Sequence, residues 1–154
     1  GRRQALPLLA ALPLAACGFT PVYGPGGTAS ALRGQIAFAA PENGQEFSLV
    51  SQLENRIGRT SAARIQLDYE IRTSESALAV TVEEDINRIN ITGVAAYTLT
   101  DLASGEQVQG GEVTSFTAFA SSGSPVAIAA ARRDAESRLM TILADQIVTR
   151  LLAG

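Results

Sequence analysis

Residues 64–72 read RIQLDYEIR, an unbroken alternation of polar and apolar side chains. Because successive side chains of a β-strand point to opposite faces of its sheet, this pattern predicts a strand with one buried and one solvated face. The buried face would hold Ile65, Leu67, Tyr69 and Ile71. One-sided burial is typical of antiparallel sheets, so helices should lie over the apolar side.

Segments before and after this stretch continue the sheet. Further strands are expected over residues 33–39, 89–99 and 106–120, and the alternation also continues through residues 79–82. In the last strand, Gly110 and Gly111 should form a bulge, because the alternation loses register there.

Two segments have the apolar spacing of amphipathic helices. The first starts at Glu46, and Gly58 is suited to end it in a left-handed conformation. Its apolar stripe consists of Phe47, Val50, Leu53 and Ile57. The second helix starts after Ser124, an N-cap residue type, with Pro125 at the first helical position.

The second helix continues to the last residues of the sequence. Its apolar stripe consists of Ile128, Ala131, Ala135, Leu139, Ile142, Leu143, Ile147 and Leu151. Its solvated face should carry two i, i+4 ion pairs, Arg132 with Glu136 and Asp134 with Arg138. The order β-α-β-β-β-α predicts an α+β fold, a four-stranded, mainly antiparallel sheet with two helices packed on one face.

The N-terminal residues have the pattern of a lipoprotein signal peptide. Arg2 and Arg3 precede an apolar stretch over residues 5–14, which is too short to cross a bilayer as a helix of about 20 residues. Small residues then lead to Cys17, whose thiol can carry a lipid. We expect cleavage after Ala16 and a lipid anchor on Cys17.

This interpretation divides the chain into three parts. Residues 1–16 are the signal peptide, residues 17–30 are a lipidated flexible tether rich in Gly and Pro, and residues 31–154 form a single domain. The residue after the lipidated cysteine is Gly18, not the Asp that commonly retains bacterial lipoproteins at the inner membrane. We therefore expect the protein at the cell outer membrane, lipid-anchored on the periplasmic side.

Composition excludes several functional classes. The sequence has no His and a single Cys, so it lacks the usual parts of Ser-His, Cys-His and zinc sites. We expect no catalytic residue, no metal and no cofactor apart from the covalent lipid. The 12 cationic residues are all Arg, and without Arg2 and Arg3 the mature chain holds 10 Arg against 15 acidic residues. This balance argues against nucleic acid as a partner.

Two stretches resemble a known family. Residues 14–24 read LAACGFTPVYG, and the last helix contains RRDAE at 132–136 and LADQI at 143–147. With this order of elements they resemble the LptE family of lipopolysaccharide-assembly lipoproteins from Gram-negative bacteria. The resemblance implies a non-catalytic protein that plugs the LptD β-barrel, helps that barrel assemble, and helps bind lipopolysaccharide and deliver it to the outer leaflet.

Lipopolysaccharide carries phosphates and acidic sugars, which Arg binds through charge-assisted hydrogen bonds. Arg72 and Arg88 are the candidate contacts, because they flank the connection between two expected strands. A solvated surface charge is the competing interpretation for each residue.

Two alternatives remain open at this point. Glu83, Glu84 and Asp85, near Asn87 and Arg88, are a carboxylate cluster that an enzyme could use, although neighbouring residues of a strand point to opposite faces. A one-sided sheet under amphipathic helices could instead open a cleft for acyl chains, as in a periplasm-facing lipid or lipoprotein carrier module with a different partner.

Overall fold

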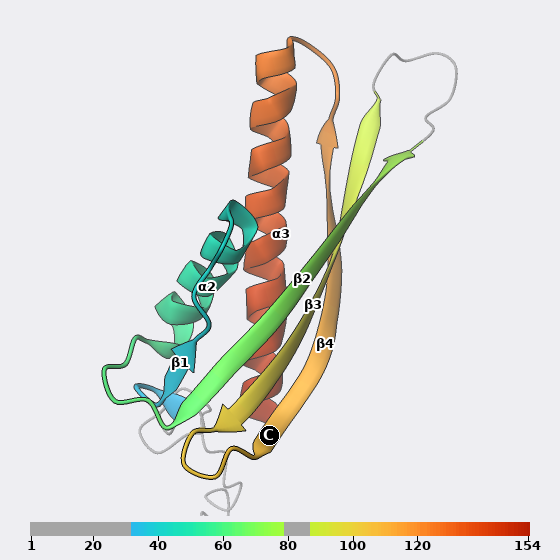
Figure 1. Cartoon of the computed structure of the whole chain (residues 1–154). Helices are drawn as coiled ribbons and strands as arrows, with labels where there is room; N and C mark the ends of the chain where they lie inside the picture. Colours follow the sequence, from blue (N-terminus) through green and yellow to red (C-terminus); the bar gives the residue numbers. More distant parts are fainter. Residues whose placement is uncertain (1–31, 79–86) are drawn as a thin grey trace, which may run out of the picture.

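The computed structural model describes residues 32–78 and 87–154 of the chain (Figure 1). Its elements are β1 (Ile36–Phe38), α2 (Gly44–Ile57), β2 (Ile65–Leu78), β3 (Arg88–Asp101), β4 (Gln107–Ala120) and α3 (Pro125–Ala153). The strands form one sheet in the order β1-β2-β3-β4, in which β1 runs parallel to β2 and the other neighbours are antiparallel. The predicted α+β fold and its element order are confirmed. The signal peptide, Cys17, the tether up to residue 30, the 79–82 segment and the 83–85 carboxylates lie outside the described residues.

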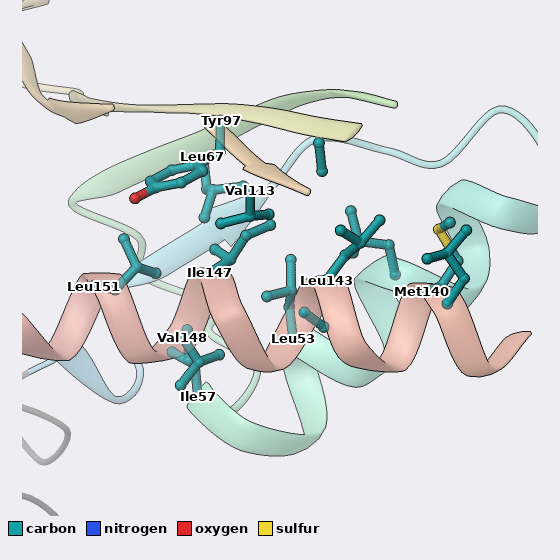
Figure 2. Close-up of a cluster of buried hydrophobic side chains, with 14 of the residues drawn as sticks. Leu53, Ile57, Leu67, Tyr97, Val113, Met140, Leu143, Ile147, Val148 and Leu151 are labelled. Carbon is teal, nitrogen blue, oxygen red and sulfur yellow. The ribbon is translucent and has the colours of Figure 1, made fainter. Parts of the chain in front are cut away.

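Both helices lie on the same face of the sheet (Figure 1). The long helix α3 runs along β3 and β4, and the shorter α2 packs beside it. Figure 2 shows where the three layers meet: Leu143, Ile147 and Leu151 of α3, Leu53 of α2, and Leu67, Tyr97 and Val113 of the sheet. Each of these side chains is at most 3% exposed.

Helix α2 begins at Gly44, two residues before the expected start, because Asn43 is an N-cap. The Asn43 side chain accepts a hydrogen bond from the backbone N–H of Glu46 at 3.0 Å and donates one to its carboxylate at 2.8 Å. Gly58 ends the helix with φ of 95°, as predicted. Its N–H donates to the carbonyl of Glu54 at 2.8 Å.

The apolar stripe of α2 was predicted with one wrong member. Phe47 is 65% exposed, whereas Leu49 is fully buried together with Val50, Leu53 and Ile57. At roughly 100° of rotation per residue, Leu49 lies nearer than Phe47 to the centre of the arc that Leu53 and Ile57 define. The buried arc therefore turns toward Leu49, and Phe47 stays in solvent.

Strand β2 is longer than predicted, since it continues past residue 72 to Leu78 and pairs with β3 over its whole length. Its last part has no apolar alternation. Thr73, Glu75 and Ala77 point to the helix side of the sheet, yet they are exposed. Neither helix covers this end of β2, so no buried face imposes a pattern on the sequence.

The bulge in β4 is not at Gly110 and Gly111. Both glycines pair in regular register, and the extra residue is Val108, which lies between the partners of Leu99 and Thr100. The glycines have another role. A Cβ at residue 111 would lie 3.0 Å from the hydroxyl oxygen of Tyr97, its direct neighbour on β3, so glycine makes room for that ring.

Helix α3 begins as predicted, with the Ser124 hydroxyl accepting a hydrogen bond from the N–H of Ala127 at 3.2 Å. Its buried face is wider than the predicted stripe and includes Met140 and Val148, because α2 packs on α3 in addition to the sheet. Ile128 and Ile142, by contrast, are only half-buried.

Only one of the two expected ion pairs on α3 is present. Arg138 contacts Asp134, with 2.9 Å between Nε and Oδ2, as predicted. The expected pair of Arg132 with Glu136 is wrong: Arg132 contacts Glu75 of β2 instead, with 3.0 Å between Nε and Oε1. A partner 57 residues away in the sequence could not be identified from helical spacing.

Candidate functional site

The face of the sheet that no helix covers carries mostly polar side chains in cross-strand rows. The residues of this face alternate along each strand with buried residues such as Leu67 and Leu99. The rows are Gln66, Thr100 and Gln107; Asp68, Thr98 and Gly110; Glu70, Ala96 and Glu112; Arg72, Val94 and Thr114; Ser74, Thr92 and Phe116; and Ser76, Asn90 and Ala118. The solvated face predicted for residues 64–72 is thus confirmed, and it extends over the three long strands.

Arg72 lies in the middle of this face, because β2 does not end there. Its Nη2 is 3.2 Å from Oε2 of Glu112, and its Nη1 is 3.7 Å from Oε1 of Glu70. Glu70 and Glu112 occupy the same row on either side of Ala96, so the guanidinium has two carboxylate neighbours. A phosphate at Arg72 would have to compete with both.

Arg88 is the first residue of β3 and lies at the other end of the face, in register with Ala120. It lines a groove of about 360 Å³ between the end of the sheet and α3. The other residues that line this groove are Ala118, Phe119, Ala120, Ala131, Asp134 and Arg138.

Arg138 is the second cation of this groove, and the sequence indicated it only as a partner of Asp134. Its Nη2 donates a hydrogen bond to the backbone carbonyl of Ala118 at 3.3 Å, which fixes the guanidinium beside the edge of β4. The i, i+4 spacing gave no sign of this position, because the contact joins residues 20 apart on different elements.

The structure does not bring the two predicted arginines together. Both are on β-strands of the uncovered face, but Arg72 is in register with Val94, six residues along β3 from Arg88. At about 3.3 Å per residue this is a separation of roughly 20 Å. The two residues therefore cannot hold a single phosphate, whereas Arg88 and Arg138 line one groove.

The groove combines positive charge with an apolar floor. Two guanidinium groups line it against one carboxylate, Asp134, while Phe119 and three alanines supply the remaining surface. Guanidinium groups bind phosphate oxygens through paired hydrogen bonds, and apolar side chains contact hydrocarbon. This arrangement suits an anionic amphiphile.

Two tyrosine and aspartate side chains with displaced pKa values lie away from the groove. Burial, with the nearby charges of Glu46 and Glu42, raises the pKa of Tyr69 to about 12. Hydrogen bonds from the backbone of Ser104 and Ala103 hold the pKa of Asp101 below its usual value. Both shifts stem from local packing and turn geometry, so they do not mark a catalytic centre.

Neither a metal cluster nor a membrane-spanning helix occurs in residues 32–78 and 87–154. No group of three His, Cys, Asp or Glu side chains in these ranges is placed to hold a metal ion. No helix in them is both long and apolar enough to cross a bilayer.

Comparison with solved structures identifies proteins of the same fold. A lipoprotein from Caulobacter crescentus matches with a TM-score of 0.68 and 22% identity, over 82% of this chain and 93% of that one. A minor lipoprotein from Acinetobacter baumannii matches with a TM-score of 0.58 and 13% identity, over 77% and 89% of the two chains. Rare lipoprotein B from Shewanella oneidensis matches with a TM-score of 0.57 and 9% identity, over 77% and 92%.

Sequence comparison supplies the family. A search of curated protein sequences finds no match. The model of the LptE family, described as lipopolysaccharide-assembly, matches residues 34–151, which include every helix and strand except the last two residues of α3. The chain therefore belongs to the LptE family of non-catalytic lipopolysaccharide-assembly lipoproteins.

Proposed function

We propose that the mature protein is anchored to the outer membrane through a lipid on Cys17, docks inside an LptD-like β-barrel, and binds lipopolysaccharide during its delivery to the outer leaflet. Membership of the LptE family supports the general role in lipopolysaccharide assembly. The observation that carries the lipopolysaccharide contact is the groove in which Arg88 and Arg138 lie over an apolar floor.

The groove matches the chemistry of lipopolysaccharide at both ends of the molecule. The phosphates and acidic sugars are acceptors for the two guanidinium groups, and the acyl chains are partners for Phe119 and the alanines. Arg72 is a secondary contact in this proposal, because its guanidinium already has Glu70 and Glu112 as neighbours.

The uncovered face of the sheet supports docking inside a barrel. The lumen of a large outer-membrane barrel is polar. Thr98, Thr100, Gln66 and the ionic group around Arg72 present hydrogen-bonding side chains over the middle of this face. Such a surface loses little when it is placed against a polar wall.

Docking is tested by purifying the tagged lipoprotein from detergent-solubilised outer membrane and identifying bound proteins by mass spectrometry. We expect one large β-barrel at about one to one that stays bound through stringent washing, as a large obligate interface should. Depletion of the lipoprotein should also lower the level of correctly assembled barrel. Recovery of no barrel, with normal barrel levels after depletion, would favour a carrier with a different partner.

Lipopolysaccharide binding is tested in cells by placing a photo-crosslinking phenylalanine analogue at Ala120, which is exposed at the groove. We expect an adduct with lipopolysaccharide, and Arg88→Ala and Arg138→Ala should each reduce its yield severalfold, since a hydrogen bond to a charged group contributes about 1.5–3 kcal/mol. Arg59→Ala is the matched control, because Arg59 is exposed on another part of the domain and pairs only with Glu54. Equal yields in all variants would contradict the groove as the binding site.

A further inference from the structure

Arg132 of α3 reaches across the sheet at the end that carries the groove. Its Nε lies 3.0 Å from Oε1 of Glu75 in β2, and its guanidinium carbon lies 5.5 Å from the centre of the Phe119 ring in β4. Because β3 lies between β2 and β4, this one side chain spans the width of a strand. It connects the first part of α3 to the strand farthest from it among the three long strands.

The helices leave this end of the core partly open. Ile91, in register with Glu75, is buried, and Ile89, in register with Phe119, is half-buried. On the same side of the sheet, Glu75 and Ala77 of β2 are exposed. In the described part of the chain, the long side chain of Arg132 is therefore what bridges α3 and β2 here.

Phe119 joins this end of the core to the groove. One side of its surroundings is the Arg132 guanidinium, and it also forms the groove floor with Ala118 and Ala131. Phe119 is only 4% exposed and pairs with Ile89 on the neighbouring strand. An apolar path therefore leads from the groove past Phe119 to Ile89.

We infer that the ion pair between Arg132 and Glu75 is a strap that closes the end of the core, and that its opening admits an acyl chain of the lipopolysaccharide molecule whose phosphate lies between Arg88 and Arg138. This inference rests on the proposed function, since it takes lipopolysaccharide as the ligand. The two strap side chains are 45% and 37% exposed. Water competes for such a pair, so it opens at low cost.

The strap is tested with the full-length lipoprotein in living cells, with the photo-crosslinking analogue at Ala77. This residue is exposed and in register with Ile89, so it reports on the entrance that the strap closes. Adducts are detected with an antibody to lipopolysaccharide, and mass spectrometry determines whether the crosslink is to an acyl chain. The analogue at Ala120 reports on the groove in parallel.

We expect Arg132→Ala and Glu75→Ala each to raise the acyl-chain adduct at position 77 by about two- to fivefold, the population shift that loss of an exposed ion pair produces. The charge-swapped double variant, Glu75→Arg with Arg132→Glu, should return the yield to the wild-type level. Arg59→Ala, which breaks an exposed ion pair far from the strap, should leave it unchanged.

The two sites separate the possible failures. An adduct at Ala120 that depends on Arg88, without any acyl-chain adduct at Ala77 in the strap variants, would overturn the strap alone. Absence of an adduct at both positions would overturn the proposed lipopolysaccharide contact and the strap with it. A rise at Ala77 that the charge swap does not reverse would show that the ion pair does not control entry.

Discussion

Leu139 of α3 packs directly against the backbone of Gly93 in β3. A Cβ at residue 93 would lie 2.8 Å from Cδ2 of Leu139 and 3.2 Å from Cδ1 of Leu143. Both leucines are fully buried. The missing side chain therefore lets α3 lie close to the centre of the sheet, on the strand between β2 and β4.

The first prediction concerns this contact. Gly93→Ala should lower the free energy of unfolding by about 1–3 kcal/mol, because the added methyl group overpacks a filled core. Gly44→Ala is the control, since no atom lies within 4 Å of the position its Cβ would take and the residue starts a helix. Urea denaturation should show destabilisation for Gly93→Ala only, and equal midpoints would contradict the close packing.

A second prediction concerns the buried hydroxyl of Thr117, which donates a hydrogen bond to the backbone carbonyl of Ala135 at 2.8 Å. Thr117→Val keeps the shape and removes the donor, so unfolding should become easier by about 1 kcal/mol. Thr149→Val makes the same change at an exposed site, where the hydroxyl bonds only to the carbonyl of Asp145. Thermal unfolding followed by circular dichroism should show a lower midpoint for the first variant and little change for the second.

A third prediction uses the raised pKa of Tyr69, whose hydroxyl donates to the carbonyl of Ala39 at 3.1 Å. Because folding favours the neutral phenol, its contribution is complete below the unfolded pKa of 10 and is lost as pH rises toward the folded pKa of about 12. Wild-type stability should therefore fall between pH 10 and 12. In Tyr69→Phe this part of the decline should be absent, and denaturation at pH 9 and pH 11 would reveal a persistent slope if another group were responsible.

A fourth prediction concerns the expected lipid anchor. Cys17→Ala should abolish lipid attachment and mislocalise the protein, since the thiol is the only possible acceptor of the anchor in this sequence. The domain should still fold, because every residue of its hydrophobic core lies between Leu32 and Leu152. Membrane fractionation and circular dichroism of the variant would test the two halves separately, and loss of sheet and helix signal would show that the N-terminal residues contribute to folding.

Periodicity was sufficient for the elements that have one buried and one solvated face. The alternation around Leu67 and Tyr69 predicted which side of β2 is buried, and the caps at Gly58 and Ser124 predicted one end of each helix. It was insufficient at the end of β2, where Thr73 and Glu75 lie in a regular strand without a covering helix. Where nothing is buried, the pairing of backbones leaves no trace in side-chain polarity.

The candidate site was only half visible in the sequence. Arg88 was identified from its place beside a strand connection, and it does line a groove. Arg138 was assigned to a local helix pair, which it forms, but its contact with β4 depends on how α3 crosses the sheet. Arg132 was assigned to Glu136, and the fold gives it Glu75 instead.

The sequence by itself determined the order of the elements, the polar and apolar faces of the sheet and the family to which the chain belongs, because these depend on local periodicity and on residue identity along one stretch of chain. Only the tertiary structure decided which arginines share a groove, which carboxylate Arg132 reaches and why residue 93 is glycine. These are contacts between residues far apart in the sequence. They are fixed by the angle and depth at which α3 packs on the sheet, which no local pattern encodes.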